Sequence, residues 1–87
     1  MKIKEGFLLR KVAGNIIVVP TGNKVMDFNV MISLNETGAF LWELLNNELT
    51  ELQLVEKIIA EFKVSKKIAQ EDVKTFVKRL EKEGLLE

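Results

Sequence analysis

Three types of side chain that often take part in catalysis are absent from this chain of 87 residues. It contains no histidine, cysteine or tyrosine, so it lacks the usual general base near neutral pH, a thiolate nucleophile and most ligands for transition metals. Glu71 and Asp72 are adjacent carboxylates. We expect them in the first turn of the last helix, where offsetting the helix dipole explains them better than acid–base chemistry. The sequence therefore predicts a protein that is not an enzyme and binds no cofactor or metal.

A row of lysines is the second feature with possible chemistry. Lys74, Lys78 and Lys82 recur at every fourth position, which places them on one face of a helix. The row fits a solvated face, and it also fits contact with a peptide or protein. Nucleic-acid binding by a small winged-helix protein is a further alternative. It is disfavoured because 13 basic residues balance 13 acidic ones, whereas phosphate recognition normally leaves an excess of positive charge.

Composition indicates one folded domain that spans residues 1–87. Hydrophobic residues make up 47% of the chain and charged residues 30%, as is typical of globular proteins. The absence of cysteine excludes disulfides. No apolar stretch approaches the roughly 18 residues of a membrane helix, and the amino terminus lacks the features of a signal peptide. We therefore expect a cytoplasmic protein.

Three strands are expected in the first 34 residues. The runs 7–12 and 16–19 are rich in strand-forming residues and flank a turn of Ala13, Gly14 and Asn15, which predicts a hairpin. Pro20 has no amide proton and ends the second strand. The third strand, 25–34, alternates apolar and polar residues almost without a break. One of its faces should therefore lie on the core and the other in solvent.

Three helices should follow the strands. The first begins after a cap, supplied either by Asn35 or by Ser33 in a capping box with Glu36. The second begins at a capping box of Thr50 and Gln53 and ends near residue 62. The third begins near residues 68–70 and reaches residue 84. There a glycine at the left-handed position would let Leu85 contact Leu80, as in a Schellman motif.

The order of strands and helices predicts an α+β fold, with a three-stranded antiparallel sheet packed on a three-helix, winged-helix-like unit. Leu34 ends the core face of the third strand, and Phe40 and Leu41 continue the same core on the first helix. Trp42 fits the core better than it fits a surface anchor. Gly38 is unfavourable in a helix and indicates close packing against a neighbour.

An exposed strand edge is the most promising binding feature. A simple meander leaves its first and third strands as edges. The first carries Arg10 and Lys11, which discourage pairing, whereas residues 25–34 contain no lysine, arginine or proline. An extended peptide could add to this edge by β-augmentation, and a second copy of the chain could pair there to form a homodimer. Met31, on the polar face, is either a scattered surface residue or part of a contact patch.

The groove beside this edge would lie between the third strand and the last helix. Val73 and Val77 could form its apolar wall, and Lys74 or Lys78 at its rim could attract acidic residues of a peptide.

Three runs carry a resemblance to a known family. "LNETGAFLWELL", "TELQLVEKIIAEF" and "EDVKTFVKRLEKEGLL" resemble, in order and spacing, the coenzyme PQQ synthesis protein D family, also described as RiPP recognition elements. The resemblance implies a noncatalytic adaptor. Such an adaptor binds the leader of a ribosomally made precursor peptide and presents it to a modifying enzyme, often a radical SAM enzyme.

The resemblance also implies a site. The leader would lie antiparallel along the third strand, in the cleft beside the last helix. Backbone pairing then falls to a continuous segment of the strand: Asp27, Phe28, Asn29, Val30, Met31, Ile32 and Ser33. Side-chain contacts fall to four residues of the last helix: Val73, Lys74, Val77 and Lys78.

Overall fold

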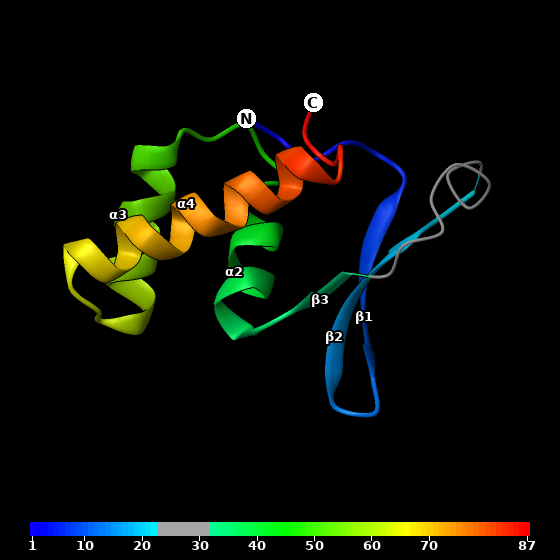
Figure 1. Cartoon of the computed structure of the whole chain (residues 1–87), viewed down its shortest axis with the longest axis horizontal. Helices are drawn as coiled ribbons and strands as arrows, with labels where there is room; N and C mark the ends of the chain where they lie inside the picture. The colour runs from blue at the N-terminus through cyan, green and yellow to red at the C-terminus, as the bar shows by residue number, and fades with distance from the viewer. Residues whose placement is uncertain (23–31) are drawn as a thin grey trace.

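The computed structural model describes residues 1–22 and 32–87. Strands precede helices, as Figure 1 shows by colour along the chain. The elements are β1 (Phe7–Val12), β2 (Asn15–Pro20), β3 (Ile32–Leu34), α2 (Glu36–Leu44), α3 (Glu51–Phe62) and α4 (Lys66–Lys82). The expected α+β fold is therefore confirmed. Most of the third strand expected at 25–34 lies outside the described residues.

A two-residue turn joins β1 to β2. Val12 lies opposite Asn15, and the two residues between them, Ala13 and Gly14, have φ angles of 51° and 82°. Two consecutive positive φ angles define a type I′ turn, whose twist matches that of the flanking strands. The predicted hairpin is confirmed, and its turn fixes the register of the two strands.

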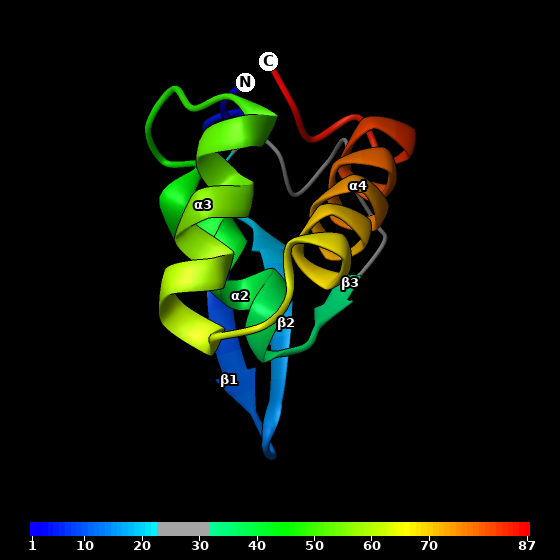
Figure 2. The same cartoon turned by 90° about the vertical axis from the view of Figure 1, so that its left-hand side faces the viewer.

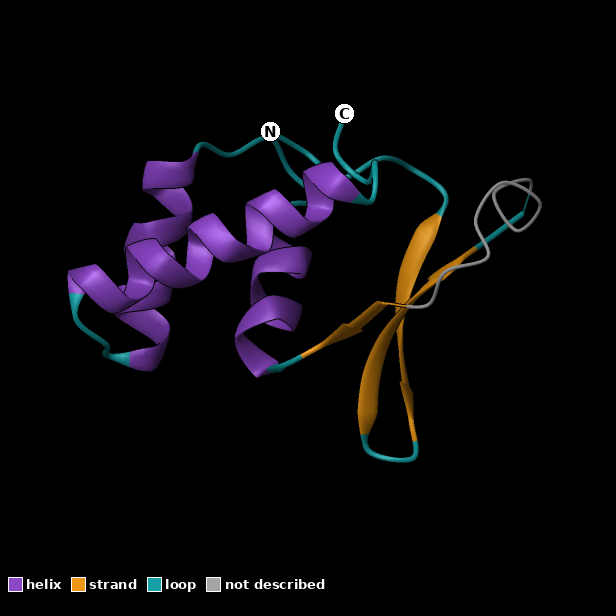
Figure 3. Ribbon diagram, in the orientation of Figure 1, coloured by secondary structure: helices purple, strands orange, loops and turns teal. Residues whose placement is uncertain are grey.

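The sheet has the order β1-β2-β3, with both neighbouring pairs antiparallel. Ile16 lies opposite Leu34, and Val18 lies opposite Ile32. The helices lie on one side of this sheet and cover part of that face, while the turn of the β1–β2 hairpin projects beyond them, as Figures 1 and 2 show from two directions. Val18 and Ile32 are 2% and 4% exposed because they lie on that covered face. Among the described strands, β3 has a neighbour on one side only; Figure 3 draws the strands in orange and the helices in purple.

Side-chain caps set the starts of α2 and α3. Asn35 Oδ1 accepts a hydrogen bond from the Gly38 amide at 2.7 Å, so Asn35 rather than Ser33 is the cap of α2. At α3, the Thr50 hydroxyl accepts from the Gln53 amide at 3.2 Å, and the Gln53 side chain accepts from the Thr50 amide at 2.9 Å. This confirms the predicted capping box.

The start of α4 differs from the prediction. The helix begins at Lys66, because the Ser65 hydroxyl accepts a hydrogen bond from the Ile68 amide at 3.2 Å and caps the first turn. The expected start at 68–70 is therefore wrong. Glu71 and Asp72 consequently lie beyond the first turn, which contains no acidic residue, so dipole compensation at the first turn does not explain them.

The carboxyl end of α4 closes as expected. Gly84 has a φ of 70°, its amide donates to the Glu81 carbonyl at 3.1 Å, and the Leu85 amide donates to the Leu80 carbonyl at 2.9 Å. These two bonds define a Schellman motif. Leu80 and Leu85 are 0% and 1% exposed, so the motif also turns an apolar residue back into the core.

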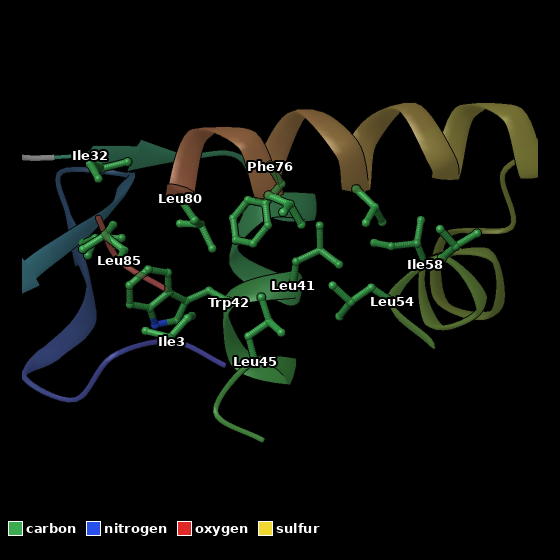
Figure 4. Close-up of a cluster of buried hydrophobic side chains, with 14 of the residues drawn as sticks. Ile3, Ile32, Leu41, Trp42, Leu45, Leu54, Ile58, Phe76, Leu80 and Leu85 are labelled. Atoms are coloured by element: carbon green, nitrogen blue, oxygen red, sulfur yellow. The ribbon is translucent and has the colours of Figure 1, made fainter. Parts of the chain in front are cut away.

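One apolar core joins the sheet to the helices. Trp42 is 2% exposed, which confirms its place in the core, and Figure 4 shows it in the cluster that also holds Ile3 and Leu85. The rings of Phe40 and Phe62 meet edge to face with centroids 5.4 Å apart. The core therefore runs from β3 through α2 to α3 and α4.

The first residues of the chain are bound to its last ones, which the sequence did not predict. Ile3 forms a β-bridge with Leu86, and the Lys4 amide donates to the Leu85 carbonyl at 2.9 Å. The amino group of Met1 donates to Glu48 Oε1 at 2.7 Å.

Within residues 1–22 and 32–87, no helix is long and apolar enough to cross a membrane.

Candidate functional site

A hollow of about 190 Å³ lies where β3 passes into α2, beside α4. The strand and the start of the helix supply one wall, formed by Ser33, Leu34, Asn35, Thr37 and Gly38. The abrupt passage from strand to helix, with Asn35 as the cap, places backbone and small side chains along this wall. The end of β3 therefore borders the hollow directly.

The opposite wall is one face of α4. Asp72, Thr75, Phe76 and Arg79 line it, and their spacing of three or four residues places them on a single side of the helix. Phe76 is 7% exposed, and Leu41 of α2, which also lines the hollow, is fully buried. The hollow therefore has apolar side chains at its base and polar ones along its α4 rim.

Gly38 keeps α2 close to the end of β3. A Cβ atom at this position would lie 3.2 Å from Asn35 Oδ1 and 3.4 Å from Leu34 Cβ. The first of these distances is shorter than most Cβ contacts, so a side chain here would press on the atom that caps the helix. The close packing that the sequence indicated at Gly38 is confirmed.

The register of the hairpin determines which backbone groups of β3 face outward. The residues that flank a two-residue turn exchange hydrogen bonds, and such pairs alternate along an antiparallel ladder. Val12 and Asn15 are the flanking pair, so Ile17 directs its amide and carbonyl toward β1. Ser33 lies opposite Ile17 on the other side of β2. The amide and carbonyl of Ser33 therefore face away from β2, at the outer edge of the sheet.

A hydrogen bond from a side chain of α4 supports this orientation of the Ser33 carbonyl. Arg79 Nη1 donates to the carbonyl oxygen of Ser33 at 3.2 Å. The guanidinium could not reach that oxygen if it pointed into the β2 ladder. Two independent observations, the register and this hydrogen bond, thus place an outward carbonyl of β3 in the hollow.

The hollow carries charges of both signs. Arg79 and Asp72 line it seven residues apart on α4, which is about 10.5 Å along the helix axis. Within the described ranges, neither side chain takes part in an ion pair. The positive charge lies at the Ser33 end of the hollow, because Arg79 contacts Ser33 there.

The structure describes two of the strand residues predicted for the site. Ser33 is exposed and lines the hollow. Ile32 is 4% exposed and belongs to the core, and by the same alternation its amide and carbonyl face β2. The other five predicted strand residues, Asp27 to Met31, lie outside the described residues.

The predicted residues of α4 lie elsewhere on the helix. Val73 and Val77 are 1% and 3% exposed and pack in the core, and Lys74 and Lys78 are exposed but do not line the hollow. Hydrophobic periodicity identified the buried face of α4 correctly, but the face beside β3 adjoins it and is partly polar. Sequence reasoning missed Asp72, Thr75, Phe76 and Arg79 as lining residues. The change from a polar residue at 75 to an apolar one at 76 marks the border of the buried face, and this change could have indicated the lining of the hollow.

Comparisons with known proteins agree with the fold. The family model of coenzyme PQQ synthesis protein D matches residues 15–86. A solved structure of TbiB1 in complex with the TbiA(beta) leader peptide is similar over the whole chain and 95% of its own, with a TM-score of 0.75 and 22% sequence identity. No curated protein matches the sequence.

Proposed function

Because the chain belongs to the coenzyme PQQ synthesis protein D family, we propose that it is a RiPP recognition element, a peptide-binding adaptor for the leader of a ribosomally made precursor peptide. The single observation that carries the proposal is the outward-facing backbone of Ser33 beside the hollow. The similar fold of TbiB1, whose solved structure contains a leader peptide, supports it.

Binding would proceed by β-augmentation. The leader runs antiparallel along the outer edge of β3 and exchanges backbone hydrogen bonds with Ser33. Alternate side chains of an extended peptide point to the same side, so one of them enters the hollow above Leu41 and Phe76. Backbone bonds hold the peptide regardless of its sequence, and the hollow supplies selectivity.

The other residues that the sequence predicted for the site have the following roles in this proposal. Beyond Ser33, the leader would pair with alternate residues back along the chain to Asp27, and Ile32 would keep its bonds to β2. Lys74 and Lys78, on the exposed face of α4, act at long range on an acidic leader. Val73 and Val77 support the α4 wall from the core and do not touch the peptide.

The adaptor would have no catalytic role of its own. It holds the precursor while a separate enzyme, which we propose to be a radical SAM enzyme, modifies the part of the peptide beyond the leader. Tethering converts an encounter in solution into one at high effective concentration. This division of labour needs no catalytic side chain in the adaptor.

An NMR titration tests the proposal. The ¹⁵N-labelled protein is titrated with a synthetic peptide that covers the leader of a short precursor encoded beside its gene. The amides of Ser33, Thr75 and Arg79 should shift first, and that of Lys57 on the exposed side of α3 should not. Shifts confined to α3, or to the lysine row of α4, would overturn the proposed site.

The same titration separates two other occupants of the surface. Random duplex DNA at low salt should leave the Ser33 amide unchanged. Size-exclusion chromatography across a wide concentration range should show one species of constant size. A dimer that dissociates when the leader is added would show that a second copy of the chain uses the same edge.

A further inference from the structure

Arg79 brings a positive charge to the outward backbone of β3. Its Nη1 donates to the Ser33 carbonyl at 3.2 Å. A guanidinium has five N–H donors, and no other hydrogen bond or ion pair joins Arg79 to a described residue. Its side chain is exposed, so its remaining donors are available to a ligand that enters the hollow.

A guest strand must use the same carbonyl as an acceptor. Its arrival either displaces the guanidinium from the Ser33 oxygen or leaves the two donors sharing that oxygen. In both cases the guanidinium lies against the guest, next to the guest residue that pairs with Ser33. A carboxylate at that point would replace a bond to a neutral carbonyl with a charge-assisted bond, which is roughly twice as strong and can be bidentate.

The inference rests on the proposed function and deepens it. We propose that Arg79 is a specificity-determining residue that selects guest peptides with an aspartate or glutamate next to the residue paired with Ser33. Arg79 thereby serves two states. In the free protein it covers the exposed carbonyl of the sheet edge, and in the complex it binds the acidic side chain of the peptide.

Asp72 restricts where the acidic residue can lie. It lines the same hollow about two helical turns from Arg79, and a carboxylate placed beside it would be repelled. A guest that runs antiparallel to β3 passes the Asp72 end before the Arg79 end, because β3 itself runs from Ile32 toward Asn35. The acidic residue should therefore follow the part of the peptide that fills the hollow.

A selection with displayed peptides tests the inference without knowledge of the natural leader. A random library of 12-residue peptides is selected separately on the wild type, R79Q, R79E and the charge-matched control K57Q, which changes an exposed lysine of α3. Wild type and K57Q should enrich aspartate or glutamate at one position. R79Q should lose that enrichment, and R79E should enrich lysine or arginine there.

Affinities of one selected peptide complete the test. Replacing its acidic residue with the matching amide should weaken binding to the wild type by about tenfold and leave binding to R79Q almost unchanged. Binding that weakens equally in both proteins would overturn the role of Arg79. Circular dichroism checks that each variant folds.

The selection also separates this inference from the proposed function. Peptides that shift the Ser33 amide but show no acidic position would contradict the inference and leave the adaptor intact. A library that yields no peptide for this edge would contradict both.

Discussion

The guanidinium of Arg79 lies 3.2 Å from the carbonyl oxygen of Ser33 and joins α4 to the outer edge of β3 across 46 positions of the sequence. The contact identifies a strand edge that has no partner strand among the described elements. A bare edge is a hazard for unwanted association, and charged side chains are a common protection. Here the protecting group also borders a hollow, so the same contact marks the entrance of the proposed site.

Proline substitutions should distinguish the two described backbone positions of the site. Ser33→Pro removes an amide that faces outward, and proline is tolerated at such edge positions. The fold should survive, while peptide affinity falls about threefold to tenfold for the lost hydrogen bond. Ile32→Pro removes an amide from the β2 ladder and should unfold the sheet. Thermal melts and fluorescence polarisation with a labelled leader peptide measure both effects, and equal loss of stability in the two variants would contradict the assignment.

Substitutions on α4 should separate its hollow face from its core face. Thr75→Phe adds bulk to an exposed residue that lines the hollow. It should weaken peptide binding by about tenfold or more, because the ring occupies space the peptide needs, with a change in unfolding free energy within about 0.5 kcal/mol. Val73→Ala should do the opposite and cost about 1–3 kcal/mol of stability. Urea unfolding and peptide titration of both variants provide the comparison; a Thr75 variant that binds normally would exclude that face.

Gly38→Ala tests the packing of α2 against β3. Alanine in place of a helical glycine normally stabilises by about 1 kcal/mol. Here the new Cβ would lie 3.2 Å from Asn35 Oδ1 and would disturb a cap that contributes about 1 kcal/mol. We expect no gain, or a small loss, in the midpoint of urea unfolding. A gain of 1 kcal/mol would show that the Asn35 side chain can move away from the new Cβ without weakening the cap.

Gly84→Ala should destabilise the end of α4. The residue has a φ of 70°, a conformation that costs a residue with a Cβ about 1 kcal/mol or more. Glu83→Ala is the matched control, because Glu83 has a right-handed conformation with φ of −85°, and its change should stay within about 0.5 kcal/mol. Equal effects in urea unfolding would count against the Schellman motif.

Local signals predicted most of the fold. Three features depend on residues close together in the chain, so the sequence shows them directly. They are the capping box of Thr50 and Gln53, the helix end at Gly84 and Leu85, and the turn at Ala13 and Gly14. Ser65 shows the limit of such signals. Lysines follow it and no carboxylate lies in the first turn, so the usual signs of a helix start are absent there and the start of α4 was expected at 68–70 instead.

The site was harder to predict because it depends on how elements are rotated against each other. Periodicity places Val73 and Val77 on the buried face of α4, but it does not tell which flank of that face adjoins β3. That depends on tertiary packing, and the answer was the flank with Asp72 and Arg79. The bridge of Ile3 to Leu86 was missed for a similar reason, since it joins the two ends of the chain.

Hydrogen exchange at the Ser33 amide is the most direct test of an open strand edge. In the free protein this amide should exchange rapidly, whereas those of Ile32 and Leu34 should be protected by β2, because exchange reports local hydrogen bonding and opening. On addition of the leader peptide, the Ser33 amide should become protected while its two neighbours change little. A Ser33 amide that is already protected in the free protein, and is unchanged in the complex, would contradict the account.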